Sequence, residues 1–227
     1  SDSPHIKKNE IKPWRQKGWV IPPKQCSGFV ANMEMVLDVY KRPYDPKRPV
    51  LCMDESPRQL IAEAKSPIAA APGQPARYDY EYRRCGTYNV FLVCEPLAGK
   101  RFLDILETKT KRDWACFLET IADEYKNAQL ITLVMDNLNT HTPGALYETF
   151  PPEKAKALWD RFEFVYTPKH GSWLNMAEIE LNVLTGQCLK RRIDNISDVK
   201  KKRWLGRKPE IPRMPKSIGS SQQKTHG

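Results

Sequence analysis

The chain has 227 residues, 40% hydrophobic and 10% aromatic, which suffices for one good-sized domain with extensions or two small ones. No apolar run approaches the ~20 residues that span a bilayer, and no signal peptide pattern occurs, so we expect a cytoplasmic protein without a membrane partner. The net charge of +10 invites a nucleic-acid partner, but residues 200–227 alone hold nine Lys or Arg against one acidic residue. The remaining residues are nearly balanced, with 28 basic and 26 acidic side chains, so charge alone predicts no DNA-binding surface there.

Cysteine usage indicates a reducing compartment. The six cysteines stand at positions 26, 52, 85, 94, 116 and 188 without a CxxC pair. This spacing is typical of reduced thiols, and it offers no cluster of ligands for zinc.

The N-terminal part predicts a linker, one helix and a first buried strand. Residues 1–30 contain Lys, Trp and Pro in the manner of a linker. Apolar residues at helical spacing over 29–40 predict a helix that ends before Pro43. The apolar run in PVLCMDES, residues 49–56, predicts a strand buried on both faces, and the prolines of 61–76 predict a loop.

The middle of the chain predicts β-structure followed by a helix. Segments that favour strands cover residues 76–82, 86–96 and 100–106, and the PLAG sequence between the last two is typical of a hairpin turn. Residues 109–128 place large apolar side chains on one face and therefore predict an amphipathic helix.

The C-terminal half predicts alternating strands and helices. Strands are expected at 129–135 and 162–168, with two short helical pieces, broken by a Pro-Pro pair, over 142–160 between them. A last helix over 171–192 follows, with Ser172 as its N-cap. The order of elements predicts an α/β fold, in which an antiparallel meander and later crossover units form one mixed sheet covered by helices.

Two predicted strands end in an aspartate, Asp54 after VLCM and Asp136 after ITLVM. A single aspartate in such a place is most often a turn residue or a helix cap. However, sites collect in the loops at the carboxyl ends of strands, and two carboxylates on neighbouring strands repel unless they share a proton or a cation. The pair therefore indicates a site of oxygen ligands, which suits Mg²⁺ or Mn²⁺.

A third carboxylate is available on the last predicted helix. At about 100° per residue, Glu178 falls on the stripe of Leu174, Ala177 and Leu181 that packs on the sheet. An acid within a buried stripe is costly unless something binds it. Glu178 is therefore the better candidate ligand, and Glu180 is expected to be a solvated surface charge.

The three acids lie in the blocks CMDES, VMDNLNTH and PKHGSWLNMAEIE. With these flanking residues they resemble the catalytic domain of mariner-like bacterial insertion-sequence transposases, which are DDE superfamily endonucleases within the ribonuclease H-like and retroviral integrase superfamily. The similarity covers roughly residues 5–199. The 41 residues between Asp136 and Glu178 exceed the spacing usual in eukaryotic mariner relatives, and a helical insert at 142–160 would account for them. The resemblance implies a ribonuclease H-like sheet of five strands flanked by helices.

The resemblance also implies a chemistry. It predicts DNA cleavage and strand transfer at insertion-sequence ends, with two Mg²⁺ or Mn²⁺ ions held by Asp54, Asp136 and Glu178. In the division of labour typical of the superfamily, Asp54 binds both ions and the other two acids bind one each. The implied partners are terminal inverted repeats and target DNA, with a homodimer on the DNA, in the bacterial cytoplasm at the nucleoid.

Polar residues near these acids are candidates to contact DNA or to hydrogen-bond the metal-binding carboxylates. Asn137 follows Asp136 directly and His141 follows it by five residues; the alternatives are packing or capping for the histidine and an ordinary turn for the asparagine. Lys169, His170 and Trp173 precede Glu178, and the alternative for them is a polar loop with a core tryptophan.

The resemblance divides the chain into three parts. Residues 1–48 are expected to be a linker and helix that follow an absent N-terminal helix-turn-helix module, and 49–199 are expected to be the catalytic domain. Residues 200–227 form a basic tail without apolar periodicity, expected to be disordered. Because the Lys200–Lys202 run would be A-rich in DNA, we hypothesise that the sequence from about residue 201 is frame-shifted.

Two rival functions remain open. An aspartyl-phosphate phosphotransferase also uses an aspartate at a strand end, but it needs a second aspartate two residues on, where this chain has Ser56. The other rival is a truncated transposase remnant, inactive in transposition, that folds and at most binds DNA non-specifically.

Overall fold

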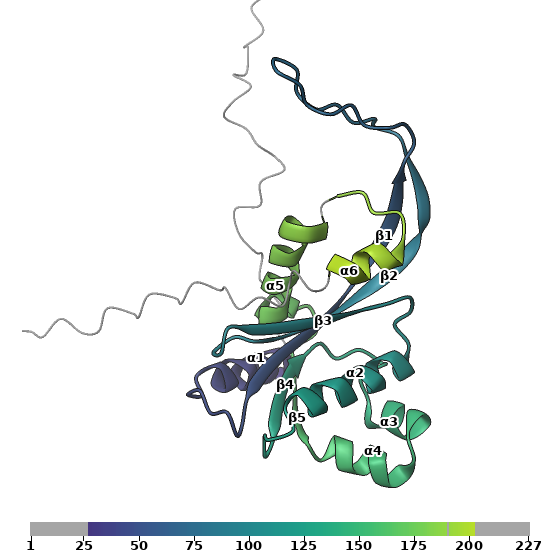
Figure 1. Ribbon diagram of the computed structural model, residues 1–227. Helices are drawn as coiled ribbons and strands as arrows, with labels where there is room; N and C mark the ends of the chain where they lie inside the picture. Colours follow the sequence, from purple (N-terminus) through teal and green to yellow (C-terminus); the bar gives the residue numbers. More distant parts are fainter. Residues whose placement is uncertain (1–26, 190, 203–227) are drawn as a thin grey trace, which may run out of the picture.

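A computed structural model describes residues 27–189 and 191–202 (Figure 1). The expectations for residues 1–26 and 203–227, including most of the frame-shift hypothesis, lie outside this range. The strands are β1 (Val50–Glu63), β2 (Tyr82–Glu95), β3 (Lys100–Leu106), β4 (Ile131–Met135) and β5 (Phe162–Tyr166). The helices are α1 (Ser27–Tyr40), α2 (Lys111–Glu124), α3 (Pro143–Thr149), α4 (Pro152–Trp159), α5 (Met176–Leu184) and α6 (Ile196–Lys202), with a 3₁₀ turn at Ser172–Leu174 and a π-helical turn at Thr185–Leu189.

The five strands form one sheet in the order β3-β2-β1-β4-β5. The first three strands pair antiparallel, with the PLAG turn between β2 and β3, whereas β4 pairs parallel to both β1 and β5. This arrangement confirms the predicted mixed sheet of a meander followed by parallel strands. It brings the carboxyl ends of β4 and β5 beside Asp54 of β1, but β1 itself continues to Glu63. The prediction that the first strand ends in Asp54 is therefore wrong, because pairing with β2 extends β1 beyond this point.

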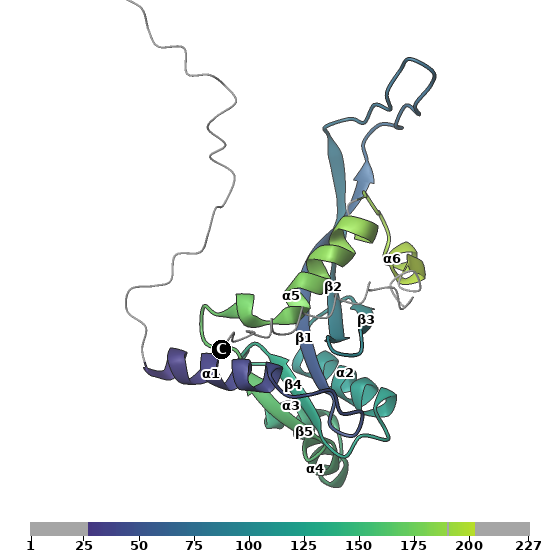
Figure 2. The same ribbon diagram turned by 90° about the vertical axis from the view of Figure 1, so that its left-hand side faces the viewer.

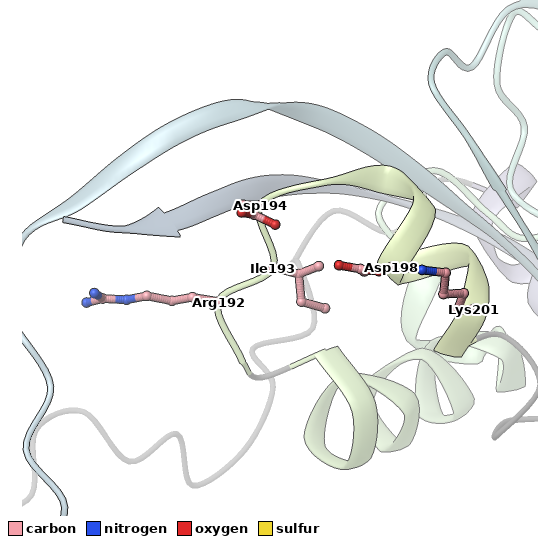
Figure 3. A pocket seen from close by; sticks show the side chains of 5 residues that line it. All are labelled: Arg192, Ile193, Asp194, Asp198 and Lys201. Carbon is pink, nitrogen blue, oxygen red and sulfur yellow. Dashed lines mark hydrogen bonds and ion pairs between the residues drawn. The ribbon is translucent and has the colours of Figure 1, made fainter. Parts of the chain in front are cut away.

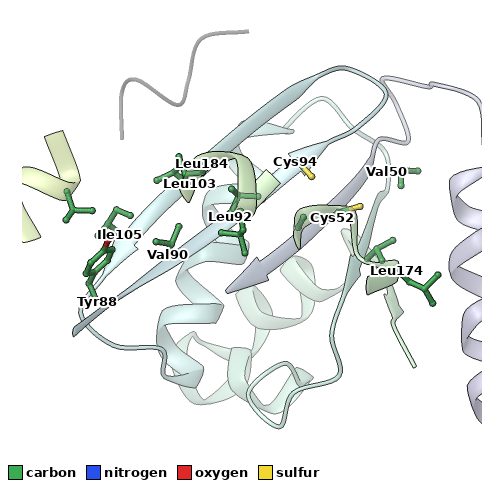
Figure 4. Close-up of a cluster of buried hydrophobic side chains, with 14 of the residues drawn as sticks. Val50, Cys52, Tyr88, Val90, Leu92, Cys94, Leu103, Ile105, Leu174 and Leu184 are labelled. Atoms are coloured by element: carbon green, nitrogen blue, oxygen red, sulfur yellow. The ribbon is translucent and has the colours of Figure 1, made fainter. Parts of the chain in front are cut away.

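Helices cover both faces of the sheet, and each face has its own apolar core. Helices α1, α5 and α6 cover one face, over a cluster shown in part in Figure 4 that includes Val36, Cys52, Leu92, Leu181 and Val199. Helices α2, α3 and α4 cover the other, over a cluster that includes Met53, Phe91, Trp114, Leu133 and Leu146. Because side chains alternate along a strand, neighbouring residues of β1 serve opposite cores.

The β1–β2 ribbon runs on past the helices and ends in a long connection, as Figures 1 and 2 show. Pairing continues to Glu63 opposite Tyr82, with a register shift after Gln59. The predicted loop at 61–76 therefore begins later than expected, because its first three residues complete a strand ladder. The predicted strand at 76–82 is wrong except at its last residue, since residues 76–81 form only an isolated bridge at Arg77.

One pocket of about 250 Å³ lies beside α6 and is lined by Arg192, Ile193, Asp194, Asp198 and Lys201 (Figure 3). None of the three predicted metal-binding acids contributes to it. Within residues 27–189 and 191–202 no helix is both long enough and apolar enough to cross a membrane.

Candidate active site

Two of the three acids lie level with each other just beyond the point where the parallel pairing of β1 and β4 ends. The last paired residues of β1 and β4 are Cys52 and Val134, and Asp54 and Asp136 each lie two residues further along. Cys52 and Val134 both belong to the core beneath α1 and α5. Because side chains alternate along β1, Asp54 points to that same face, and Asp136 follows the last residue of β4 at the same level.

Glu178 lies in the first turn of α5, the helix that covers this face. The helix begins at Met176, and its N-cap is Asn175, whose side-chain oxygen accepts the N–H of Ala177 at 3.1 Å. The expected N-cap at Ser172 is wrong, because Ser172 starts a separate 3₁₀ turn that ends before the helix. Glu178 is partly buried, as its place in the apolar stripe predicts.

Two buried contacts anchor the start of α5 to the rest of the site. The Asn175 amide donates to the Met53 carbonyl at 2.7 Å, directly before Asp54 in the chain. The Tyr40 hydroxyl of α1 donates to the Leu174 carbonyl at 2.8 Å. Glu178 and Asp54 therefore belong to segments joined by a hydrogen bond rather than by packing alone.

The three acids are close enough to influence one another electrostatically. Burial raises the pKa of Asp54 from 3.8 to about 6; the Glu55 N–H, which donates to its carboxylate at 2.8 Å, opposes the rise, and the charges of Asp136 and Glu178 add to it. Among the described residues, no Lys or Arg forms an ion pair with any of the three acids. A cation placed among them would relieve both the burial cost and the repulsion.

The donor set fits a hard divalent cation. All three side chains offer oxygen, the ligand that Mg²⁺ and Mn²⁺ prefer. In the part of the chain that the structure describes, no three His, Cys, Asp or Glu side chains are grouped so that they could enclose a single ion. Mg²⁺ usually takes only one or two protein carboxylates and completes its shell with water and substrate phosphate. An open, carboxylate-lined edge of this kind suits such partial coordination better than a closed cage.

His141 is buried beneath Asp136 and touches it twice. Its Nδ1 lies 3.1 Å from the Asp136 carbonyl oxygen and 3.3 Å from Oδ1, and its Nε2 lies 2.9 Å from Oε1 of Glu55. The ring stacks on Trp114, with centroids 5.3 Å apart. Burial alone would lower the pKa of His141, but the hydrogen bonds to Asp136 and Glu55 outweigh it and raise the pKa to about 9. The protonated ring donates from both nitrogens to these acceptors.

The remaining candidates lie on the surface of the same edge. Asn137 is exposed in the loop after β4. Lys169, His170 and Trp173 are exposed in the loop between β5 and α5, and 42% of the Trp173 surface is accessible. The alternative of a core tryptophan at position 173 is thereby wrong.

The loop that presents these three side chains is held in a tight turn. His170 has φ of 65°, in the left-handed region, and the Gly171 N–H donates to the Pro168 carbonyl at 2.8 Å. A Cβ atom at Gly171 would lie 2.5 Å from the Pro168 ring. Any other residue at position 171 would therefore push the turn apart.

Glu180 is not the solvated surface charge that its helical position suggested. Its carboxylate is 2.8 Å from Arg101 of β3, and both side chains are mostly buried. The helical wheel placed it correctly off the central stripe, but β3 covers that border and provides a cation.

Two residues at the site, Glu55 and Asn175, are not predicted by the sequence pattern. Glu55 stands beside Asp54, where the sequence shows only the end of a strand. Asn175 lies inside the helix predicted over 171–192 and was therefore not expected to be its N-cap. Only the local composition could have pointed to these two residues, since each is a polar residue next to apolar or small residues.

Comparison with known proteins identifies a family and a fold for the chain. Residues 49–200 match the model of the family described as DDE superfamily endonuclease. Among solved structures, the Mos1 mariner paired end complex with Mn matches with a TM-score of 0.55 and 19% identity, over 84% of this chain and 57% of that chain. The catalytic domain of Mos1 mariner transposase matches with a TM-score of 0.52 and 17% identity, over 82% of this chain and 83% of that chain. The curated proteins contain no match.

These matches differ in what they establish. At 17–19% identity the solved structures show the fold, which is the ribonuclease H-like fold expected from the sequence. The chain spans 57% of the length of the Mos1 chain in the paired end complex. The family model, in contrast, covers more than half of this sequence and all five strands of the sheet. The chain therefore belongs to the DDE superfamily endonucleases, and its catalytic core has the fold of a mariner transposase.

Proposed function

We propose that this chain is the catalytic domain of a DDE transposase, which cleaves DNA at the ends of an insertion sequence and transfers the freed strand to target DNA. One observation carries the proposal: Asp54 and Asp136 lie level where the parallel pairing of β1 and β4 ends, with Glu178 near enough to affect the ionisation of Asp54. Family membership and the fold support it.

The three acids would hold two Mg²⁺ or Mn²⁺ ions, Asp54 contacting both and Asp136 and Glu178 one each. Bound ions of this kind activate an attacking oxygen and stabilise the charge that develops in an in-line phosphoryl displacement. The solved Mos1 complexes carry Mn and Mg in their descriptions, which supports the choice of cation. The role of the protein is to keep three mutually repelling carboxylates in place, through the β1–β4 pairing and the Asn175 contact to Met53.

The reaction needs no covalent protein intermediate. In cleavage, water attacks the phosphorus, the bond from phosphorus to the 3′ oxygen breaks, and a 3′-hydroxyl leaves. In transfer, that hydroxyl attacks a phosphodiester of the target and displaces a target 3′ oxygen, so the number of phosphodiester bonds is unchanged. Asn137, Lys169, His170 and Trp173, exposed at the same edge, are the side chains we propose to contact DNA.

The full set of partners is also a proposal. Solved Mos1 structures are described as paired end and strand transfer complexes. By analogy, inverted-repeat ends, target DNA and a second copy of the chain would be the partners here. His141 is buried, so we assign it to Asp136 rather than to DNA.

Nicking of supercoiled plasmid DNA in Mn²⁺ tests the site assignment. Asp54→Asn, Asp136→Asn and Glu178→Gln should each reduce nicking by at least 100-fold, because each removes a charged ligand without changing side-chain volume. Glu180→Gln is the matched control, two residues from Glu178 and paired with Arg101. It should keep most of the activity.

The outcomes separate the proposal from its alternatives. Equal nicking by the wild type and all three variants would refute the site. A wild-type chain that binds Mn²⁺ and loses this binding in the three variants, yet never nicks DNA, would support the inactive remnant instead.

A further inference from the structure

Glu55 has no assigned role, although it follows Asp54 directly. Its Cα pairs with Phe91, whose side chain lies in the core beneath α2, so Glu55 points to the opposite face from Asp54. Only 4% of its side chain is accessible. An isolated carboxylate is rarely buried in this way, since removing it from water costs several kcal/mol unless a partner compensates.

The partner of Glu55 is His141, which links it to the second metal-binding strand. Nε2 of His141 lies 2.9 Å from Glu55, and Nδ1 lies 3.1 and 3.3 Å from the carbonyl and carboxylate oxygens of Asp136. Stacking on Trp114 and a hydrogen bond from the Tyr166 hydroxyl to the His141 carbonyl, at 3.3 Å, restrict the ring and its backbone. A continuous buried connection thus runs from β1, through the loop after β4, to the carboxylate at the end of β4.

We infer that Glu55 is a positioning residue for the metal site: it orients His141, and His141 in turn fixes the carboxylate of Asp136. The inference rests on the proposed function, and it assigns to Glu55 no contact with DNA or cation. Outer hydrogen-bond partners of this kind orient the ligand itself, and their removal typically weakens metal binding by 10–100-fold.

Stability alone does not account for the arrangement. A buried ion pair is often no more stabilising than apolar side chains of the same volume. Apolar residues at positions 55 and 141 could fill the space beside Trp114, but they could not fix the direction of the Asp136 oxygens. Asp136 is one-third exposed at the sheet edge, so without His141 its side chain is free to turn toward solvent.

Titration calorimetry of the full chain with Mn²⁺ at pH 8 tests the inference without relying on activity. Glu55→Gln keeps the volume and one acceptor but removes the charge, and it should raise the Mn²⁺ dissociation constant by about 10-fold. The matched control is Glu95→Gln, which alters another buried carboxylate on the same face of the sheet, hydrogen-bonded to Tyr125 at 3.0 Å. That control should leave the Mn²⁺ affinity unchanged.

A double-mutant cycle identifies the route of the effect. His141→Asn keeps an amide donor near Asp136 but cannot reach Glu55. If Glu55 acts only through His141, adding Glu55→Gln to His141→Asn should weaken Mn²⁺ binding no further. Additive effects on affinity would overturn this route. If Glu55→Gln does not fold, the Mn²⁺ dissociation constant of His141→Asn is compared with that of the wild type. A higher constant supports the positioning route through His141, and an unchanged constant overturns it.

Failure of the inference can be distinguished from failure of the proposed function. Unchanged Mn²⁺ affinity in Glu55→Gln, with binding abolished in Asp136→Asn, would overturn the positioning role and leave the site intact. Unchanged affinity in Asp136→Asn and Glu178→Gln would overturn the site itself, and the inference with it. Equally weakened binding in Glu55→Gln and Glu95→Gln would show a general effect of buried carboxylates and would also overturn the positioning role.

Discussion

At the scale of single residues, the charge of Asp54 opposes folding and favours a cation. Burial, together with the charges of Asp136 and Glu178, raises its pKa from 3.8 to about 6. The folded chain thus binds this proton more tightly than the unfolded chain does. The cost of ionising Asp54 is accordingly absent below pH 3.8, grows between the two pKa values, and is complete above about pH 6.

Replacing Asp54 by Asn should stabilise the metal-free protein. At pH 8 in EDTA we expect Asp54→Asn to raise the free energy of unfolding by roughly 1–3 kcal/mol, because the amide carries no charge to bury and still accepts the Glu55 N–H. Near pH 3.5 the gain should largely vanish, since the wild-type carboxyl is then protonated in the folded state and mostly protonated in the unfolded state. Urea denaturation at the two pH values measures the difference.

The control for this prediction is Asp45→Asn. Asp45 accepts the Lys47 N–H at 2.8 Å in a turn, away from the three acids. Its substitution should bring no gain at either pH. A loss of stability in Asp54→Asn at pH 8 would contradict the account of burial and repulsion at Asp54.

At the scale of elements, helix α5 is held to the sheet by its cap as well as by its apolar stripe. Asn175 donates to Met53 and accepts from Ala177, so one buried side chain satisfies a strand carbonyl and a helix N–H. Both Ser172 and Asn175 are residue types that favour N-caps. The choice between them depends on the Met53 carbonyl, 122 residues away in the sequence, which no local pattern reports.

Asn175→Ala should therefore cost more than the loss of an ordinary cap. We expect a decrease of roughly 2–4 kcal/mol in the free energy of unfolding, since the substitution removes the cap and leaves the buried Met53 carbonyl without its partner. Thr110→Ala, which removes the solvent-exposed cap of α2, should cost roughly 1 kcal/mol. Chemical denaturation of both variants tests the order, and equal decreases would show that the hydrogen bond to Met53 contributes nothing.

At the scale of the whole molecule, the charge and the candidate site lie in different parts of the chain. The acids that we propose to bind metal belong to the central sheet and α5, whereas residues 200–227 carry a balance of +8 out of the total of +10. Non-specific attraction to DNA depends on the number of phosphates that basic side chains neutralise. The site and the net charge can therefore be changed independently.

Removing residues 203–227 should separate these two properties. The deletion takes away six basic residues and one acidic residue. We expect weaker binding to non-specific DNA at low salt and a shallower dependence on salt, by ~0.9 in the logarithmic slope for each phosphate that the chain no longer neutralises. The Mn²⁺ affinity should stay unchanged. Fluorescence anisotropy over a range of salt concentrations measures the first effect, and an unaltered slope would contradict the prediction.

The difference between local and long-range interactions explains how much of this protein was predictable. Short-range periodicity predicted the mixed sheet and most helices, because these depend on residues close together in the chain. The same local patterns indicated the three candidate acids. The outer part of the β1–β2 ribbon was not predictable in this way, since it has no apolar pattern and is held by pairing across the two strands as far as Glu63 and Tyr82. The start of α5 was not predictable either, because it depends on the hydrogen bond from Asn175 to the distant Met53 carbonyl.

By itself the sequence indicated the candidate residues for the chemistry: two acids that directly follow apolar runs and one acid in the apolar stripe of a helix. Only the tertiary structure decided how their neighbours act. Glu55, adjacent to Asp54, faces the opposite core and meets His141, and Glu180 pairs with Arg101, 79 residues away. The physical reason is that a side chain's direction follows from local backbone geometry, whereas its partner depends on which distant element packs against that direction.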